Sequence, residues 1–255
     1  MKTSKCTIVA IPFDRVAEAY DSTRALSPEI MARITDSMKE VLIDCSTVLD
    51  VGVGTGRFAH PLGEKGLHVV GIDVSLSMML KAKQKGLKDL VRADARKLPF
   101  HNRTFDSVLI VHVLHLVDDW IEIVHEASRV AGSLIISLIG TASGFRIRRE
   151  YLRLREEMGR PLNRLNNAEE GLRRLLPPKQ IRSVGEFTTT VNSEEVIASL
   201  EHGDFAISWD LPEDFHSRII GKLRAEYGER NYSRTDRYEI AAWTPEQFRR
   251  FKQDR

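Results

Sequence analysis

Three alternating glycines, Gly52, Gly54 and Gly56, are the feature of this sequence that most clearly suggests chemistry. They stand in VLDVGVGTGRF, between a short β-rich run and a helical segment. Glycine tolerates positive φ angles and lets a ligand come close to the backbone. In folds with parallel strands, ligands bind at such turns, beyond the carboxyl ends of the strands. A glycine-rich turn can also exist without a ligand, so this pattern alone is weak evidence for a small-molecule site.

The neighbouring residues distinguish two kinds of ligand. The dinucleotide fingerprint G-x-G-x-x-G/A ends on a small residue, because that residue packs the helix against the strand. Here Arg57 occupies that position, and the third glycine stands one place earlier. Asp50 precedes the first glycine by two residues, where a dehydrogenase usually has an apolar residue and a methyltransferase an acid. A carboxylate there favours a sulfonium ligand that carries an ammonium group over a nicotinamide dinucleotide.

Two further aspartates follow β-rich runs. Asp73 closes HVVGID, 17 residues after Gly56, and a carboxylate in this place can accept two hydrogen bonds from a ribose diol. Asp94 follows the next short strand, in VRADARKLPF, where it can accept from an adenine amino group while the Ala95 amide donates to a ring nitrogen. Either aspartate could instead be a turn or capping residue, but the spacing favours the binding roles.

The elements that must position these residues alternate between strands and helices, which predicts an α/β fold with a mostly parallel sheet. After residue 140 the chain changes character, and we expect two late strands that complete the sheet and inserted helices that form a lid. This divides the chain into a cofactor-binding core (1–140), a lid and substrate region with one core strand (141–236), and a last strand with a C-terminal helix (237–255). The expected strands are 46–51, 68–73, 90–92, 106–112, 133–139, 186–191 and 238–243, and the expected helices include 28–43, 57–65, 75–86, 119–130, 193–201 and 212–227.

Four ordered stretches, VLDVGVGTG, GIDVSLSMML, RADARKLPF and FDSVLIVHVLHLVDDW, give a more specific signal than any one of them. Over about residues 13–139 the chain resembles the class I S-adenosylmethionine-dependent methyltransferases, in the subgroup related to ubiquinone, menaquinone and small-acid methyltransferases. The resemblance implies a Rossmann-like seven-stranded sheet with helices on both faces, its last strand antiparallel. It also implies S-adenosylmethionine as the cofactor, bound at the strand ends. One departure is the turn before 133–139, where the family usually has Gly-Gly and this chain has only Gly132.

The resemblance also assigns roles to residues. The glycines line the methionine part of the cofactor near Asp50, Asp73 holds the ribose, and His112 lies beside the methionine group and the transferred methyl. In these enzymes an N-terminal segment folds over the cofactor, so Tyr20 and Arg24 are candidates for the methionine carboxylate. The cofactor-binding candidates are Tyr20, Arg24, Asp50, Gly52, Gly54, Gly56, Asp73, Val74, Met78, Asp94, Ala95 and His112.

Methyl transfer requires mainly an aligned nucleophile and exclusion of water, so few catalytic residues need be visible. His112 is the candidate general base, whereas His115 matches a common family histidine that can be structural. Trp209 is a candidate wall of the substrate pocket, although an aromatic residue in a lid can be simple packing. The basic helices at 145–175 are either a solvated face or a source of arginines that hold an anionic substrate.

Composition narrows the function further. Net charge is +2, from 38 basic and 36 acidic residues, which argues against a dedicated nucleic-acid binder. Cys6 and Cys45 have no metal-ligand spacing, and we expect reduced thiols, no metal and a cytoplasmic protein without a membrane segment. We therefore expect a small-molecule methyl acceptor. The alternatives are an inactive S-adenosylmethionine-binding protein, an RNA methyltransferase and, last, an NAD-dependent oxidoreductase. The acceptor and the oligomeric state stay open.

Overall fold

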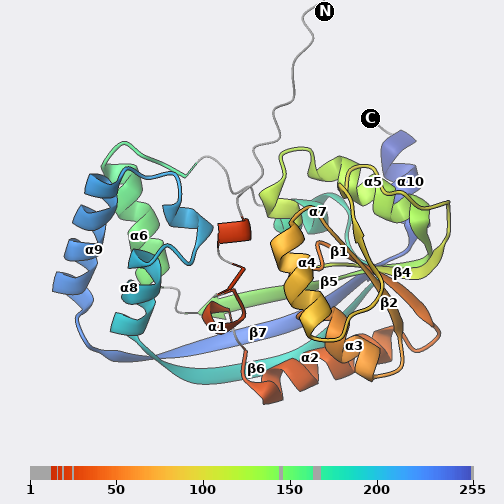
Figure 1. Cartoon of the computed structure of the whole chain (residues 1–255), viewed down its shortest axis with the longest axis horizontal. Coiled ribbons are helices and arrows are strands. Elements are labelled where there is room, and N and C mark those ends of the chain that lie inside the picture. The colour runs from red at the N-terminus through yellow and green to blue at the C-terminus, as the bar shows by residue number, and fades with distance from the viewer. Residues whose placement is uncertain are drawn as a thin grey trace, which may run out of the picture.

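A seven-stranded sheet in the order β3-β2-β1-β4-β5-β7-β6 forms the centre of the molecule (Figure 1). The computed structural model describes residues 13–253 except 16, 19, 25, 144–145 and 163–167, so Cys6 lies outside the described residues. β7 is antiparallel to both of its neighbours, and the other pairs are parallel. The predicted fold class is thereby confirmed. The strands are β1 (Thr47–Val51), β2 (His68–Asp73), β3 (Leu90–Arg92), β4 (Phe105–Ile110), β5 (Ala131–Ser143), β6 (Gln180–Asn192) and β7 (Asn231–Trp243).

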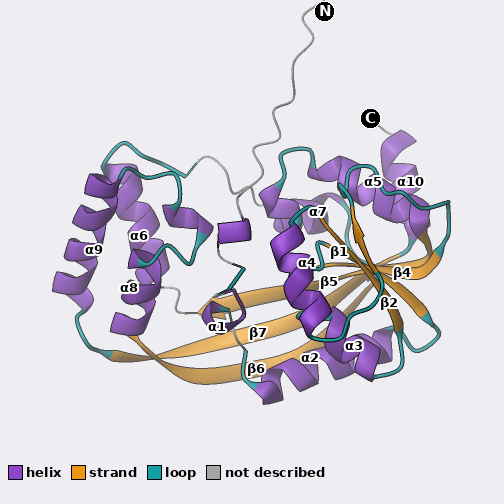
Figure 2. Cartoon of the chain, in the orientation of Figure 1, coloured by secondary structure: helices purple, strands orange, loops and turns teal. Residues whose placement is uncertain are grey.

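Helices cover both faces of this sheet because successive strand residues point to opposite sides. In β1, Val48 belongs to one core cluster and Leu49 to the other, and both are fully buried. The Val48 side packs on α2 and α3, and the Leu49 side packs on α5, α7 and α10 (Figure 2). Apolar strands covered on two faces explain the runs without alternation that the sequence shows. The helices of these layers are α2 (Pro28–Val41), α3 (Ala59–Glu64), α5 (Trp120–Val130), α7 (Ala168–Leu175) and α10 (Pro245–Gln253).

Capping residues start the helices near the glycine turn. The Ser27 hydroxyl accepts the Ile30 amide at the start of α2, and the Ser75 hydroxyl accepts the Met78 amide at the start of α4 (Leu76–Gln84). Side-chain oxygens at such positions satisfy amides that have no partner within the helix. α4 follows β2 directly, so its first turn lies beside the glycine turn.

The unusual turn before β5 is shorter than expected, because α5 ends at Val130 and β5 begins at Ala131. Gly132 is therefore a strand residue. A Cβ at this position would approach the Phe105 carbonyl oxygen to 3.2 Å, where the β4–β5 register shifts. The loss of the Gly-Gly turn is thus accommodated locally at the amino end of β5, far from the carboxyl strand ends.

Three strands extend well beyond the core and reach a group of helices. β5, β6 and β7 have 13 residues each, against 5 in β1. Near their far end lie α6 (Arg146–Glu157), α8 (Ser193–Glu201) and α9 (Glu213–Tyr227), which share their own apolar cluster (Figure 1). We call these three helices the lid. The predicted division at residues 140 and 236 stays a prediction. Among the described residues, no helix combines the length and apolar character needed to span a membrane.

Candidate functional site

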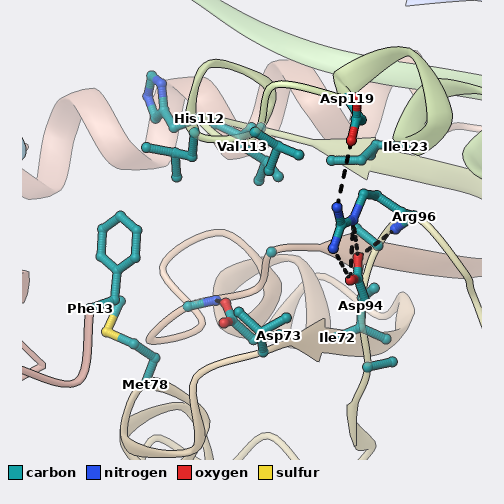
Figure 3. A pocket seen from close by; sticks show the side chains of 18 of the residues that line it. Phe13, Ile72, Asp73, Met78, Asp94, Arg96, His112, Val113, Asp119 and Ile123 are labelled. Atoms are coloured by element: carbon teal, nitrogen blue, oxygen red, sulfur yellow. Dashed lines mark hydrogen bonds and ion pairs between the residues drawn. The ribbon is translucent and has the colours of Figure 1, made fainter. Parts of the chain in front are cut away.

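A cavity of about 270 Å³ opens where β1, β2 and β4 end (Figure 3). Phe13, Asp73 and Met78 stand on one side of it, and His112 and Val113 on the other (Figure 3). We call this space the first cavity. Among the residues singled out from the sequence, it is lined by Tyr20, Gly52, Gly54, Asp73, Val74, Met78, Asp94, Ala95 and His112.

The glycine turn has left-handed backbone at Gly52, Gly54 and Gly56, with φ of 72°, 53° and 75°. L-residues rarely adopt these angles, which explains the glycine requirement. A Cβ on Gly52 would meet Val113 Cγ2 at 2.3 Å, and a Cβ on Gly56 would meet Leu87 Cδ1 at 2.4 Å. Gly56 does not line the first cavity, and its lack of a side chain instead allows Leu87 to pack closely against the turn.

Asp73 joins the glycine turn to the start of α4. One carboxylate oxygen accepts the Gly54 amide at 2.9 Å, and the other accepts the Ser75 amide at 2.8 Å. Burial raises the pKa of Asp73, although the amides of Ser75 and Gly54 oppose that shift. Each carboxylate oxygen has a second lone pair, so the turn role and the predicted ribose role are compatible. The ribose assignment itself stays a prediction.

Asp94 has a partner of its own in the wall of the first cavity. Its carboxylate accepts from Nε and Nη2 of Arg96, the latter at 2.7 Å, and Arg96 Nη1 lies 3.7 Å from Asp119 (Figure 3). The hydrogen bond from Arg96 lowers the pKa of Asp94. Asp94 is therefore an ionised acceptor held in one orientation, and any adenine amino group would share it with Arg96. Ala95 lines the same wall.

Asp50 lies beneath the cavity rather than in its lining. Its place on β1 leaves 4% of it exposed. Burial, and then the charge of Asp73, raise the pKa of Asp50 to about 8. A cation bound nearby would favour the ionised form again. This electrostatic property fits the role predicted from the sequence, which is to complement a positively charged ligand.

His112 does not end a strand as the sequence suggested, because β4 stops at Ile110. Its backbone has φ of 57°, and the residue lines both cavities. Left-handed backbone at a residue other than glycine carries strain and occurs preferentially at functional sites. Desolvation by the surrounding protein, followed by the charge of Arg57, lowers the pKa of His112 to about 4. The imidazole is therefore neutral at pH 7. His115 is engaged differently, since its Nδ1 lies 2.8 Å from Glu169.

The N-terminal segment is tied to the glycine turn and to the start of α4. The Ser75 hydroxyl donates to Asp14, and the Thr55 hydroxyl donates to Asp21, each at 2.6 Å. These bonds place Phe13 and the half-buried Tyr20 at the edge of the first cavity. The two acids could not be identified from their spacing, because their partners are 61 and 34 residues away.

A second cavity of about 420 Å³ lies between the sheet and the lid. It shares Phe13, Tyr20, His112 and Leu116 with the first cavity. Arg24 lines this second cavity rather than the first one, and its guanidinium stacks on the Tyr20 ring at 4.3 Å.

Trp209 lines neither cavity. Its indole N–H donates to the Gly203 carbonyl, and its ring packs edge-on against Phe13 at 5.7 Å. The geometry fits the packing alternative, with Trp209 supporting a residue that does line both cavities.

Sequence reasoning missed two arginines of the second cavity and did not single out a third. Arg57 attracted attention only as a misfit to the dinucleotide fingerprint, and Arg234 not at all. Arg148 belongs to the basic run at 145–175, whose other members do not all face the cavity. Arg155, for example, is fully buried and pairs with Asp210. Which arginine of this helix faces the cavity depends on the orientation of the helix.

Comparison with known proteins identifies the fold. Residues 49–135 match the methyltransferase domain family. Demethylmenaquinone methyltransferase of Thermotoga maritima is 34% identical over 134 residues, which cover 49% of this chain and 58% of that protein. The chain spans about three fifths of the length of this and similar curated relatives.

Solved structures extend the likeness to most of the chain. One is a S-adenosylmethionine-dependent methyltransferase of Thermotoga maritima, described as a possible histamine N-methyltransferase, with TM-score 0.52 and 19% identity over 91% of this chain and 98% of that one. Another is the cyclase SpnF, with TM-score 0.52 and 17% identity over 90% of this chain and 93% of that one. Residues 49–135 are thus similar to a methyltransferase domain, and the chain has the fold of solved S-adenosylmethionine-dependent methyltransferases.

Proposed function

We propose that this protein transfers a methyl group from S-adenosylmethionine to a small molecule, with the cofactor in the first cavity and the acceptor in the second. The observation that carries the proposal is that the two cavities adjoin. Both are lined by Tyr20 and His112, at the carboxyl ends of the central strands. Two ligands placed there would meet beside His112, which is the arrangement that transfer between two bound molecules requires.

The residues of the first cavity fit this cofactor. The left-handed glycines leave room for a ligand against the backbone, and Asp73 offers accepting oxygens for a diol. Val74 is an apolar side chain that is 51% exposed, and with Met78 it provides a surface for a purine ring. Asp50 supplies a buried acidic group for a ligand that carries a sulfonium and an ammonium charge.

When bound, S-adenosylmethionine supplies an electrophilic methyl carbon whose bond to sulfur breaks as the acceptor bonds to it, the electron pair passing to sulfur. The protein has to align the acceptor and exclude water. Phe13, Tyr20 and Leu116 enclose the junction of the cavities. His112 is neutral at pH 7, and its lowered pKa makes it a weak base, suited to the strongly acidic proton that a hydroxyl acceptor carries once it is methylated.

The alternatives make different predictions. The fold alone does not establish methyl transfer, since a cyclase shares it. An inactive binding protein would bind S-adenosylmethionine without converting it. An oxidoreductase would bind NAD, against which the position of Arg57 still argues. An RNA methyltransferase would bind RNA with strong salt dependence.

The test is a thermal-shift titration with S-adenosylmethionine, S-adenosylhomocysteine and NAD in parallel. A ligand at a hundredfold excess over its Kd adds about 2.7 kcal/mol of stability, which in a domain of this size raises Tm by roughly 5–10 °C. We expect a shift with the first two ligands and none with NAD. Production of S-adenosylhomocysteine with an acceptor mixture then separates an enzyme from a binding protein. Absence of a shift with either sulfur ligand refutes the cofactor assignment.

A further inference from the structure

Arginines converge on the second cavity from separate parts of the chain. Arg24 follows the N-terminal helix α1 (Tyr20–Thr23), Arg57 follows the glycine turn, Arg148 lies on α6, and Arg234 lies on β7. Among the described residues of the lining, the one carboxylate is that of Asp236. Asp236 is 3% exposed and accepts from Nε and Nη2 of Arg234. The cavity is therefore strongly electropositive.

Arg148 shows how unfavourable this concentration of charge is. Its guanidinium lies 3.7 Å from the centre of the Phe205 ring, which itself lines the cavity. Burial, and then the charges of Arg234 and Arg24, lower the pKa of Arg148 to about 10. Other interactions in the folded protein have to offset the repulsion between these arginines and the desolvation of the Arg148 charge. An anion bound among these side chains would relieve both costs.

The arginines differ in their place along the cavity. Arg24 stacks on the ring of Tyr20, which lines both cavities, so Arg24 lies near their junction. Its guanidinium is also 5.5 Å from the centre of the Phe205 ring, on which Arg148 packs at the lid. The resemblance makes Arg24 a candidate for the methionine carboxylate. Arg148 and Arg234 are then the arginines that face the second ligand from the lid and the sheet.

Most of the remaining lining is apolar or aromatic, as at Leu26, Leu138, Ile207 and Tyr238, and its hydroxyl groups include those of Thr23 and Thr141. Such a wall does not suit a small inorganic ion, because the apolar surface would stay in contact with water. It suits an organic molecule with an anionic end and an apolar body. A guanidinium pair provides planar, directional donors for the oxygens of a carboxylate or a phosphate.

We propose that the methyl acceptor is a small organic anion whose carboxylate or phosphate is held by Arg148 and Arg234, while its apolar body reaches toward His112. This assignment deepens the proposed function and rests on it for the acceptor's role. The anion site itself can be tested without any methyl transfer.

The experiment measures binding of two fluorescent probes to the full chain in the presence of saturating S-adenosylhomocysteine. The probes are 1-anilinonaphthalene-8-sulfonate and its uncharged analogue N-phenyl-1-naphthylamine, which differ by the anionic group. The variants are Arg148→Gln and Arg234→Gln. The matched control is Arg149→Gln, which changes an exposed residue of the same helix that does not line the cavity. Binding of S-adenosylhomocysteine is measured separately for every variant.

We expect the anionic probe to bind about tenfold more tightly than the neutral one. We expect either cavity variant to lose about tenfold in affinity for the anionic probe and the control to lose none, with binding of S-adenosylhomocysteine unchanged. Competition by benzoate and by phenyl phosphate then tells a carboxylate site from a phosphate site. Because Arg234 pairs with a buried acid, its variant can misfold, and the salt dependence of wild-type binding provides a second measurement.

Three results overturn the anion site: no binding of the anionic probe, equal binding of both probes, or affinity that is insensitive to salt and to both substitutions. A different result concerns the proposed function alone. If the anionic probe binds as expected but S-adenosylhomocysteine does not bind, the anion site stands and the cofactor assignment fails.

Discussion

Binding of S-adenosylmethionine should release a proton from Asp50. The pKa of this buried carboxyl is raised to about 8 by burial and by Asp73. At pH 7 such an acid is about nine-tenths protonated. A sulfonium and an ammonium group bound above it would return the pKa toward its ordinary range near 4. We therefore expect the release of about 0.9 proton from this group for each cofactor bound at pH 7, falling to about 0.1 at pH 9.

Titration calorimetry in two buffers of different ionisation enthalpy, phosphate and Tris, measures this release directly. The ligand's own amine also exchanges protons, so the informative quantity is the difference between wild type and Asp50→Asn. The amide has nearly the same shape but cannot release a proton. Wild-type affinity should rise with pH between 6 and 8 by up to about tenfold per unit, whereas the variant should lack this component.

The raised pKa of Asp50 also determines how the stability of the protein changes with pH. Because the pKa of Asp50 is raised in the folded protein, folding favours its protonated form, and the free energy of unfolding of the cofactor-free protein should decrease as pH rises from about 4 to 8. Equal proton release by wild type and Asp50→Asn at pH 7 would refute the reasoning, since it would show that Asp50 is ionised before binding or remains protonated after it.

Three further predictions concern the cavity walls. Asp73→Ala should weaken binding of S-adenosylhomocysteine by roughly 1–3 kcal/mol, because a charged acceptor and a tie to Gly54 are both lost; unchanged affinity in calorimetry would contradict the ribose role. His112→Ala should lower turnover more than cofactor affinity, once an acceptor is found, and equal activity would remove His112 from the mechanism. Gly52→Ala should lower Tm and cofactor affinity, because its Cβ would overlap Val113 Cγ2. Adding Val113→Ala should restore part of both losses, and no restoration would show that backbone strain at positive φ dominates.

Local patterns in the sequence were sufficient for most of the core. The runs 68–73, 90–92 and 193–201 match β2, β3 and α8 residue for residue. Ser27 and Ser75, which cap α2 and α4, belong to a residue type that favours this position. These features depend on interactions within a few residues, namely capping bonds and buried apolar runs. The same locality led to the cofactor candidates, because the glycine turn and the strand-end aspartates carry their own spacing.

The residues of the second cavity could not be predicted from local patterns. Arg24, Arg57, Arg148 and Arg234 come from four distant segments, and no local pattern relates them. Which arginine of α6 faces the cavity depends on how the lid packs: Arg148 enters the lining, Arg155 is buried against Asp210, and Arg149 is exposed.

The position of His112 also depended on tertiary structure. The apolar run from 106 suggested a strand up to His112, but β4 ends at Ile110 and the backbone then turns left-handed beside Gly52. By itself, then, the sequence determined the fold class and many of the residues that line the first cavity, because periodicity, caps and glycine conformations are short-range properties. Tertiary structure decided which charged side chains converge and where the two cavities meet. It also decided how far desolvation shifts the pKa values of Asp50 and His112. These properties depend on residues that are remote along the chain, because such residues supply the surrounding atoms and the nearby charges.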